Sequence, residues 1–116
     1  MGGKNPLVVL DDKVRLVSTN EAFQEKYAMP RTESEGRGLY EIMDGTWDIP
    51  ELRSALKSVL KGKGRFQKLE VEREIPPFGR RCMSLSGRSV STPSGERMVL
   101  LAVEDITERL HDEAER

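Results

Sequence analysis

The spacing of apolar residues changes twice along this chain, and that change restricts the folds open to it. Between positions 49 and 60, Ile49, Leu52, Leu56 and Val59 recur three or four residues apart, which predicts a helix. On both sides, apolar residues alternate with polar ones or form short runs, which is typical of strands. A helical block with strands before and after it predicts an α+β fold.

The N-terminal part predicts a hairpin followed by a short helix. Residues 7–10 and 14–18 are short apolar runs rich in β-branched residues, and the polar residues 11–13 between them are typical of a turn. Asn20 is a preferred N-cap, so a helix is expected from Glu21 to about Tyr27. Pro30 ends that helix.

The middle of the chain predicts a loop, a helical turn and then the longest helix. Residues 31–38 are polar and contain glycine, so we expect a loop, and residues 39–43 are expected to form one turn. Asp48 and Glu51 have the spacing of a capping box at the start of the helix. Gly62 and Gly64 end it.

The second half of the chain predicts three strands. Apolar and charged residues alternate over 68–74, a second alternation covers 81–88, and residues 93–95 are a turn sequence. Residues 98–103 are apolar on both faces, so this strand is expected at the centre of the sheet or covered on both sides. Asp105 and Glu108 again have capping-box spacing, and they predict a final helix over 105–116.

Length and composition exclude several classes of protein. The chain has 116 residues, which suits one domain. Its 19 basic and 20 acidic residues nearly balance, which argues against a nucleic-acid binder and against wholesale disorder. No apolar run approaches the roughly 20 residues of a membrane helix, so no membrane contact is expected. The single cysteine, Cys82, excludes an internal disulfide and fits a reducing, cytoplasmic setting.

These elements and several short motifs resemble a PAS domain. The motifs are the run from Leu7 to Asp11, the Asn20-Glu21-Ala22-Phe23 segment, Gly36-Arg37-Gly38-Leu39 and the closing Asp105-Ile106-Thr107-Glu108-Arg109. The resemblance implies a five-stranded antiparallel sheet with short helices on one face and a C-terminal output helix. It divides the chain into a flexible terminus or expression remnant (1–4), a sensor domain (5–104) and the truncated start of a signalling helix (105–116).

The resemblance also implies a function. It indicates a non-catalytic sensor of a bacterial signalling protein, most simply a sensor histidine kinase, that forms a homodimer and passes a stimulus to a C-terminal output domain. The alternative is a ligand-free dimerisation or interaction domain of a chemotaxis, cyclic-dinucleotide or transcription regulator. An enzyme is not expected, because the apolar segments carry His, Asp or Glu only at their ends.

Neither a covalent flavin nor a histidine-ligated haem is expected. Flavin-binding relatives that respond to light need a cysteine soon after a Gly-Arg motif, but Gly36-Arg37 is followed by Gly38 and Leu39. The only histidine, His111, falls in the terminal segment. One cysteine and one histidine cannot make a structural zinc site, and no metal site is expected. An unidentified small molecule is compatible with the sequence.

The candidate site residues form two groups. The resemblance places a ligand pocket between the sheet and the helices, and its candidate residues are Tyr40, Met43, Trp47, Leu52, Leu56, Arg81, Met83, Leu85, Leu101 and Val103. The apolar members are equally well explained as core, since a domain with few aromatic residues needs them for burial. Tyr40 and Trp47 are the foremost candidates for ligand contact. Arg81 predicts an anionic ligand, because a buried guanidinium needs a carboxylate or phosphate beside it. The second group, Asp105, Thr107 and Arg109, is implied to couple the sheet to the exit helix.

Overall fold

The structure, a computed structural model, describes residues 5–62, 64–75 and 78–108. Strands β1 (Leu7–Leu10) and β2 (Leu16–Thr19) are followed by α1 (Glu21–Lys26), α2 (Arg31–Ser34), the 3₁₀ turn η1 (Ile42–Gly45) and α3 (Pro50–Leu60). Strands β3 (Arg65–Ile75), β4 (Gly79–Ser91) and β5 (Arg97–Asp105) complete the fold. This order confirms the predicted arrangement of two strands, helices and three strands. Most of the predicted C-terminal helix lies outside the described residues.

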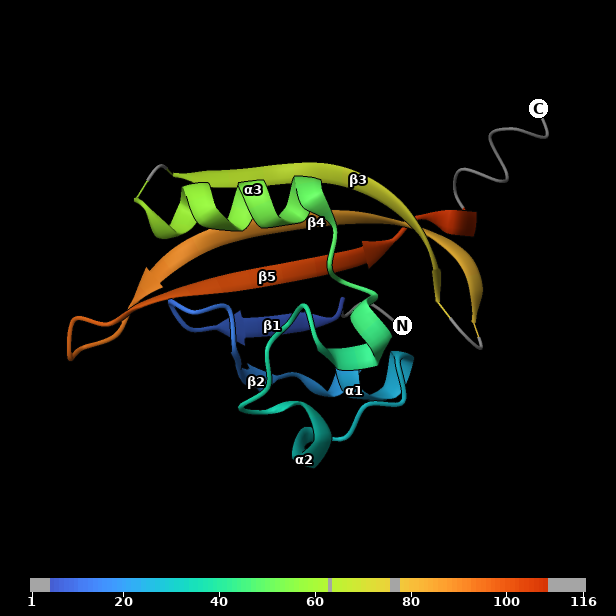
Figure 1. The fold of residues 1–116 in the computed structure, drawn as a ribbon, viewed down its shortest axis with the longest axis horizontal. Coiled ribbons are helices and arrows are strands. Elements are labelled where there is room, and N and C mark those ends of the chain that lie inside the picture. The colour runs from blue at the N-terminus through green and yellow to red at the C-terminus, as the bar shows by residue number, and fades with distance from the viewer. Residues whose placement is uncertain (1–4, 63, 76–77, 109–116) are drawn as a thin grey trace.

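The five strands form one antiparallel sheet in the order β2-β1-β5-β4-β3 (Figure 1). The last strand, β5, is central, as its apolar sequence predicted. Val99, Leu101 and Val103 face the core and are almost completely buried. Met98, Leu100 and Ala102 alternate with them and are half-buried on the opposite face.

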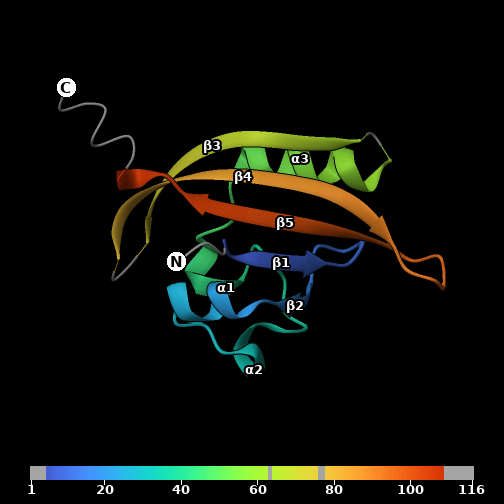
Figure 2. The same ribbon diagram turned by 180° about the vertical axis from the view of Figure 1, so that it is seen from behind.

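The helices cover one face of the sheet. Seen from behind, strands β3 and β4 lie in front of α3, so this helix packs on the far side of the sheet (Figure 2). Leu52, Leu56 and Val59 of α3 are buried at 2% exposure or less, so the helical spacing of the sequence marked the packed face correctly. No helix among the described residues is long and apolar enough to cross a bilayer.

The predicted cap of α1 is present and has an additional role. The Asn20 side-chain Oδ1 accepts hydrogen bonds from the backbone N–H of Phe23 at 3.0 Å and of Leu7 at 2.9 Å. One side chain therefore both starts the helix and joins it to β1.

Three local predictions were wrong. Residues 31–34 form the single turn α2 and not a loop, because the Pro30 carbonyl accepts bonds from the Glu33 N–H and the Ser34 hydroxyl. The turn expected over 39–43 is displaced to Ile42–Gly45. The expected capping box at α3 does not form: the N-cap is Ile49, and the Asp48 carboxylate pairs with Arg53.

Candidate functional site

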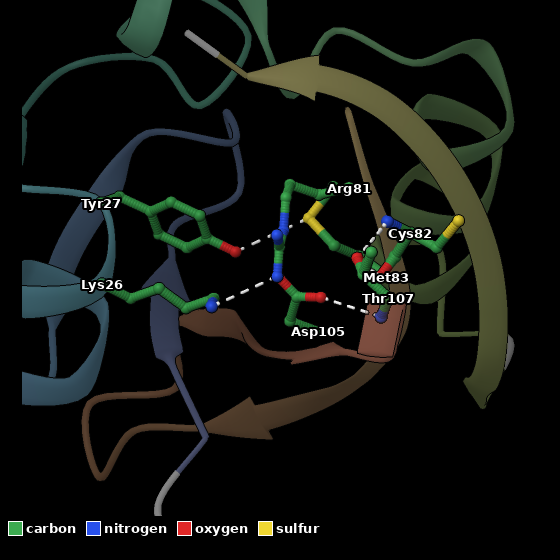
Figure 3. Close-up of polar contacts among 7 residues, drawn as sticks. All are labelled: Lys26, Tyr27, Arg81, Cys82, Met83, Asp105 and Thr107. Atoms are coloured by element: carbon green, nitrogen blue, oxygen red, sulfur yellow. Dashed lines mark hydrogen bonds and ion pairs between the residues drawn. The ribbon is translucent and has the colours of Figure 1, made fainter. Parts of the chain in front are cut away.

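The C-terminal end of β5 carries a polar cluster that joins four parts of the chain (Figure 3). Oδ2 of Asp105 accepts a hydrogen bond from Arg81 Nε of β4 at 2.9 Å and lies 3.2 Å from Lys26 Nζ of α1. Its other oxygen, Oδ1, accepts from the backbone N–H of Thr107 at 3.0 Å. The Asp105 side chain is only 10% exposed, so one mostly buried carboxylate links α1, β4, β5 and the exit segment.

A second set of bonds fastens the exit segment to β4. The Thr107 hydroxyl accepts from the Cys82 N–H at 2.8 Å and lies 3.3 Å from the Cys82 carbonyl oxygen, to which it donates. The backbone N–H of Ile106 donates to the same carbonyl at 2.9 Å. Because Ile106 is also buried at 2% exposure, the chain leaves the sheet through a fixed joint. We call Lys26, Arg81, Cys82, Asp105, Ile106 and Thr107 the exit joint.

Strand register explains how these side chains meet. Met83 pairs with Asp105 across β4 and β5, and Arg81 precedes Met83 by two residues, so Arg81 lies on the same face. Lys26 is the last residue of α1 and is followed by Tyr27, whose hydroxyl donates to Met83 Sδ at 3.6 Å. The end of α1 is therefore held against β4 beside Asp105.

The charges of the cluster stabilise one another. Burial alone would raise the pKa of Asp105, but hydrogen bonds from Arg81, Thr107 and Lys26 outweigh it and lower that pKa well below its usual range. The hydrogen bond to Asp105 raises the pKa of Arg81. Burial, together with the nearby Asp105 charge, raises the pKa of Tyr27, so its phenol stays neutral. The Asp105 carboxylate is therefore ionised at neutral pH and pairs with two cations, Arg81 and Lys26.

The apolar residues predicted to line a pocket form the packed core. Their exposures are 1% or less, and they are Trp47, Leu52, Leu56, Met83, Leu85, Leu101 and Val103. The Trp47 ring lies 5.5 Å from that of Tyr27 and 6.5 Å from that of Phe23, and its Nε1–H donates to Met43 Sδ at 3.3 Å. The polar tip of Trp47 thus finds a partner within the chain, as burial requires.

Tyr40 lies elsewhere, on the helical surface. It is half-buried, and the Arg53 guanidinium lies 4.1 Å from the centre of its ring. Tyr40 lines a surface cavity of about 560 Å³ that none of the other predicted pocket residues lines. The two foremost candidates for ligand contact, Tyr40 and Trp47, therefore belong to different surroundings.

The sequence predicted an anionic ligand for Arg81, but the structure gives this guanidinium an anion from within the chain. Asp105 supplies it, so this guanidinium needs no anionic ligand to be satisfied. Arg109, the third residue expected at the junction, lies outside the described residues, as does His111. Burial and the Glu72 charge raise the pKa of the Cys82 thiol, which does not favour a reactive thiolate. Among the described residues, no group of three or more His, Cys, Asp or Glu side chains could hold a metal ion.

Four contacts near the site could not have been predicted from the sequence. Lys26 and Tyr27 are far from Asp105 along the chain, and nothing in their spacing indicates that α1 ends beside β5. Arg73 of β3 donates to the carbonyls of Thr46 and Gly45, both at 3.1 Å, and so fixes the segment before Trp47. Only the assembled sheet brings these residues together.

A family profile and solved structures similar to this chain indicate the same fold. The family profile described as "PAS fold" matches residues 4–111. No curated protein matches the sequence. A sensory box sensor histidine kinase from Vibrio cholerae has a similar structure, with a TM-score of 0.66, 18% identity, and coverage of 90% of this chain and 83% of that chain.

Two further solved structures have the same fold. A domain of an HTR-like protein from Haloarcula marismortui has a TM-score of 0.64 at 17% identity, covering 89% of this chain and 98% of that chain. The VqmA dimer of Vibrio cholerae has a TM-score of 0.73 at 13% identity, covering 91% of this chain but 48% of that chain. These identities are low, so the structural likeness concerns the fold alone.

Proposed function

Because the chain belongs to the PAS fold family, we propose that it is the sensor module of a bacterial signalling protein of the sensor histidine kinase type. PAS domains are sensory modules and are generally non-catalytic. Here the stimulus changes the sheet, and the exit joint passes that change to a C-terminal helix and output domain. In this proposal the protein works in the cytoplasm, and its stimulus is an unidentified small molecule or a partner. On the sequence grounds given above, covalent flavin chemistry and histidine-ligated haem are not part of this function.

The observation that carries this proposal is the position of Asp105. Its carboxylate contacts α1, β4 and the exit segment at once, so any shift of the sheet against α1 changes the bonds that hold Thr107. In this proposal the bonds of Asp105 have a second arrangement, and a stimulus that favours one arrangement over the other shifts the population of the two states.

Replacing Asp105 by asparagine is expected to uncouple the output from the stimulus. The variant keeps the shape of the side chain but loses the charge that attracts Arg81 and Lys26. A thermal-shift screen of metabolites on the purified chain first selects a stabilising compound. Autokinase activity of the full-length protein is then measured with and without that compound. We expect the wild-type response to shrink at least about tenfold in the variant while compound binding persists.

The matched control is Asp48→Asn, which breaks the exposed Asp48–Arg53 pair away from the joint. It should leave the response intact. An Asp105→Asn protein that binds the compound and still responds like wild type would refute the role of the joint.

A ligand-free dimerisation module is the second candidate, and the half-buried apolar face of the sheet favours it. Leu7 and Val9 of β1 pair with Ala102 and Leu100 of β5, and all four lie on the face opposite α3. Val17 of β2 is 40% exposed. In a dimerisation module this face would pack against a second copy of the chain. A sensor that acts as a homodimer would use the same face.

A homodimer through this face predicts a light-scattering mass of twice 13.1 kDa. The Leu100→Glu variant should convert the dimer to a monomer, because a carboxylate would be buried without a partner at the interface. Lys68→Glu, which changes an exposed side chain of β3, serves as the control. A dimer that persists in the Leu100→Glu variant would exclude this face as the interface.

A further inference from the structure

The helical side of the molecule carries a cavity that the exit joint and the packed interior do not use. Its volume is about 560 Å³, which lies in the usual range for small-molecule sites. Helix α3 forms one wall, and the β1–β2 turn and Tyr40 form the other. The β1–β2 turn and the C-terminal end of α3 lie at the end of the molecule opposite the exit joint (Figure 1). The cavity is therefore a separate surface feature.

The wall formed by α3 is cationic. Arg53, Lys57 and Lys61 recur every four residues and so share one side of the helix. Lys57 and Lys61 form no ion pair with any described residue. Arg53 uses Nε to bind Asp48, and its four Nη hydrogens form no hydrogen bond with the described part of the chain. Against these cations the cavity holds one carboxylate, that of Asp12.

The remaining walls offer an apolar and aromatic surface. Val14 and Leu60 contribute aliphatic side chains, and the half-buried ring of Tyr40 lies beside the Arg53 guanidinium. Val14 has φ of 60°, which is costly for a β-branched residue. Its N–H donates to the Asp11 carbonyl and its own carbonyl accepts from Leu39 N–H, so both sides of the residue are held in place. This wall is formed before any ligand arrives.

We propose that this cavity binds a small molecule that combines a planar ring with a phosphate group. The Lys57 and Lys61 ammonium groups and the free Arg53 donors match the charge and the acceptor oxygens of a phosphate. Tyr40, Val14 and Leu60 contact the ring. Asp12 accepts hydrogen bonds from hydroxyl or amino groups of the ligand. This site is independent of the function proposed for the exit joint.

Adenosine monophosphate is the probe. Adenosine and inorganic phosphate, tested separately, show what the ring and the phosphate each contribute to binding. Nitrogen-15 NMR titrations of the chain measure each dissociation constant. We expect adenosine monophosphate to bind at least about tenfold more tightly than either part, with the amides of Val14, Tyr40 and Lys57 shifting. No saturable binding of adenosine monophosphate, or shifts confined to other residues, would overturn the proposal.

Substitutions in each wall of the cavity test what that wall contributes to binding. The Lys57→Gln, Lys61→Gln double variant should weaken binding of adenosine monophosphate about tenfold, because two charge contacts are lost. Tyr40→Leu should weaken binding of adenosine monophosphate but leave that of inorganic phosphate unchanged. Lys68→Gln removes a positive charge outside the cavity and is the matched control. Equal binding by the double variant and this control contradicts the cationic wall. All four substituted residues are exposed or half-buried, so they can be changed without emptying the core.

Discussion

Replacing Trp47 by alanine is expected to lower the free energy of unfolding by about 4 kcal/mol. The indole is 1% exposed and packs against Phe23 and Tyr27, so its removal leaves a cavity that rigid neighbours cannot fill. Trp47 is the only tryptophan, so urea denaturation is followed by far-UV circular dichroism and not by fluorescence. The control Ser58→Ala, at an exposed position of α3, should change stability by less than about 0.5 kcal/mol.

The same variant tests whether the interior is packed. A dry cavity of this kind binds small apolar molecules, so indole should restore part of the lost stability. If Trp47→Ala does not fold, Trp47→Phe provides a smaller change, and its loss should be clearly measurable. A loss below about 1 kcal/mol for Trp47→Ala would show that the space beside Trp47 was already open, as a preformed interior pocket requires.

Replacing Asp105 by asparagine is expected to lower the free energy of unfolding by about 2 kcal/mol at neutral pH. Removing one partner from a buried pair often costs more. Arg81 and Lys26 are 27% and 36% exposed, however, so water replaces part of the lost interaction. Denaturation by urea at pH 7 measures this difference.

The pH dependence has a defined sign. The pKa of Asp105 is lower in the folded chain than the value of about 3.9 expected for the unfolded chain. The ionised carboxylate therefore stabilises the fold above pH 4, and this contribution is lost as the pH falls below 4 toward the folded pKa. The stability difference between wild type and Asp105→Asn should be constant from pH 5 to 8 and shrink by pH 3. A difference that grows on acidification would rule out the ion pairs as its source.

Periodicity in the sequence was enough to predict most of the fold. The helical spacing of Leu52, Leu56 and Val59 predicted which side of α3 is buried, and the structure confirms it. The apolar run from Met98 to Val103 predicted a central strand, and β5 is central. One of the three errors arose because a single side chain had two possible partners. Asp48 has the spacing of a cap, but Pro50 removes one N–H of the first turn and Arg53 is a stronger partner.

Fewer of the contacts at the candidate site could be predicted from the sequence. Asp105 could be singled out by its capping-box spacing with Glu108, and Thr107 by the resemblance to the family. The bond from the Thr107 N–H to Asp105 is present. Lys26 and Tyr27 could not, since their contacts with β5 and β4 depend on how α1 crosses the sheet. The core role of Leu85 and Leu101 was one of two open interpretations, and only their exposure of 1% or less favours it over a ligand-lined pocket.

The central place of β5 has a consequence for how this protein is made. β1 pairs with β5, so during synthesis the first strand of this sheet has no β5 partner until the last strand of the sheet has left the ribosome. At roughly 5–20 residues per second, that delay is roughly 5–20 s. Until then β1–β2 is an isolated hairpin, which is marginally stable, and β4 has an open edge. The strand that closes the sheet also ends at Asp105, so the nascent chain completes its core and its exit joint in a single late step.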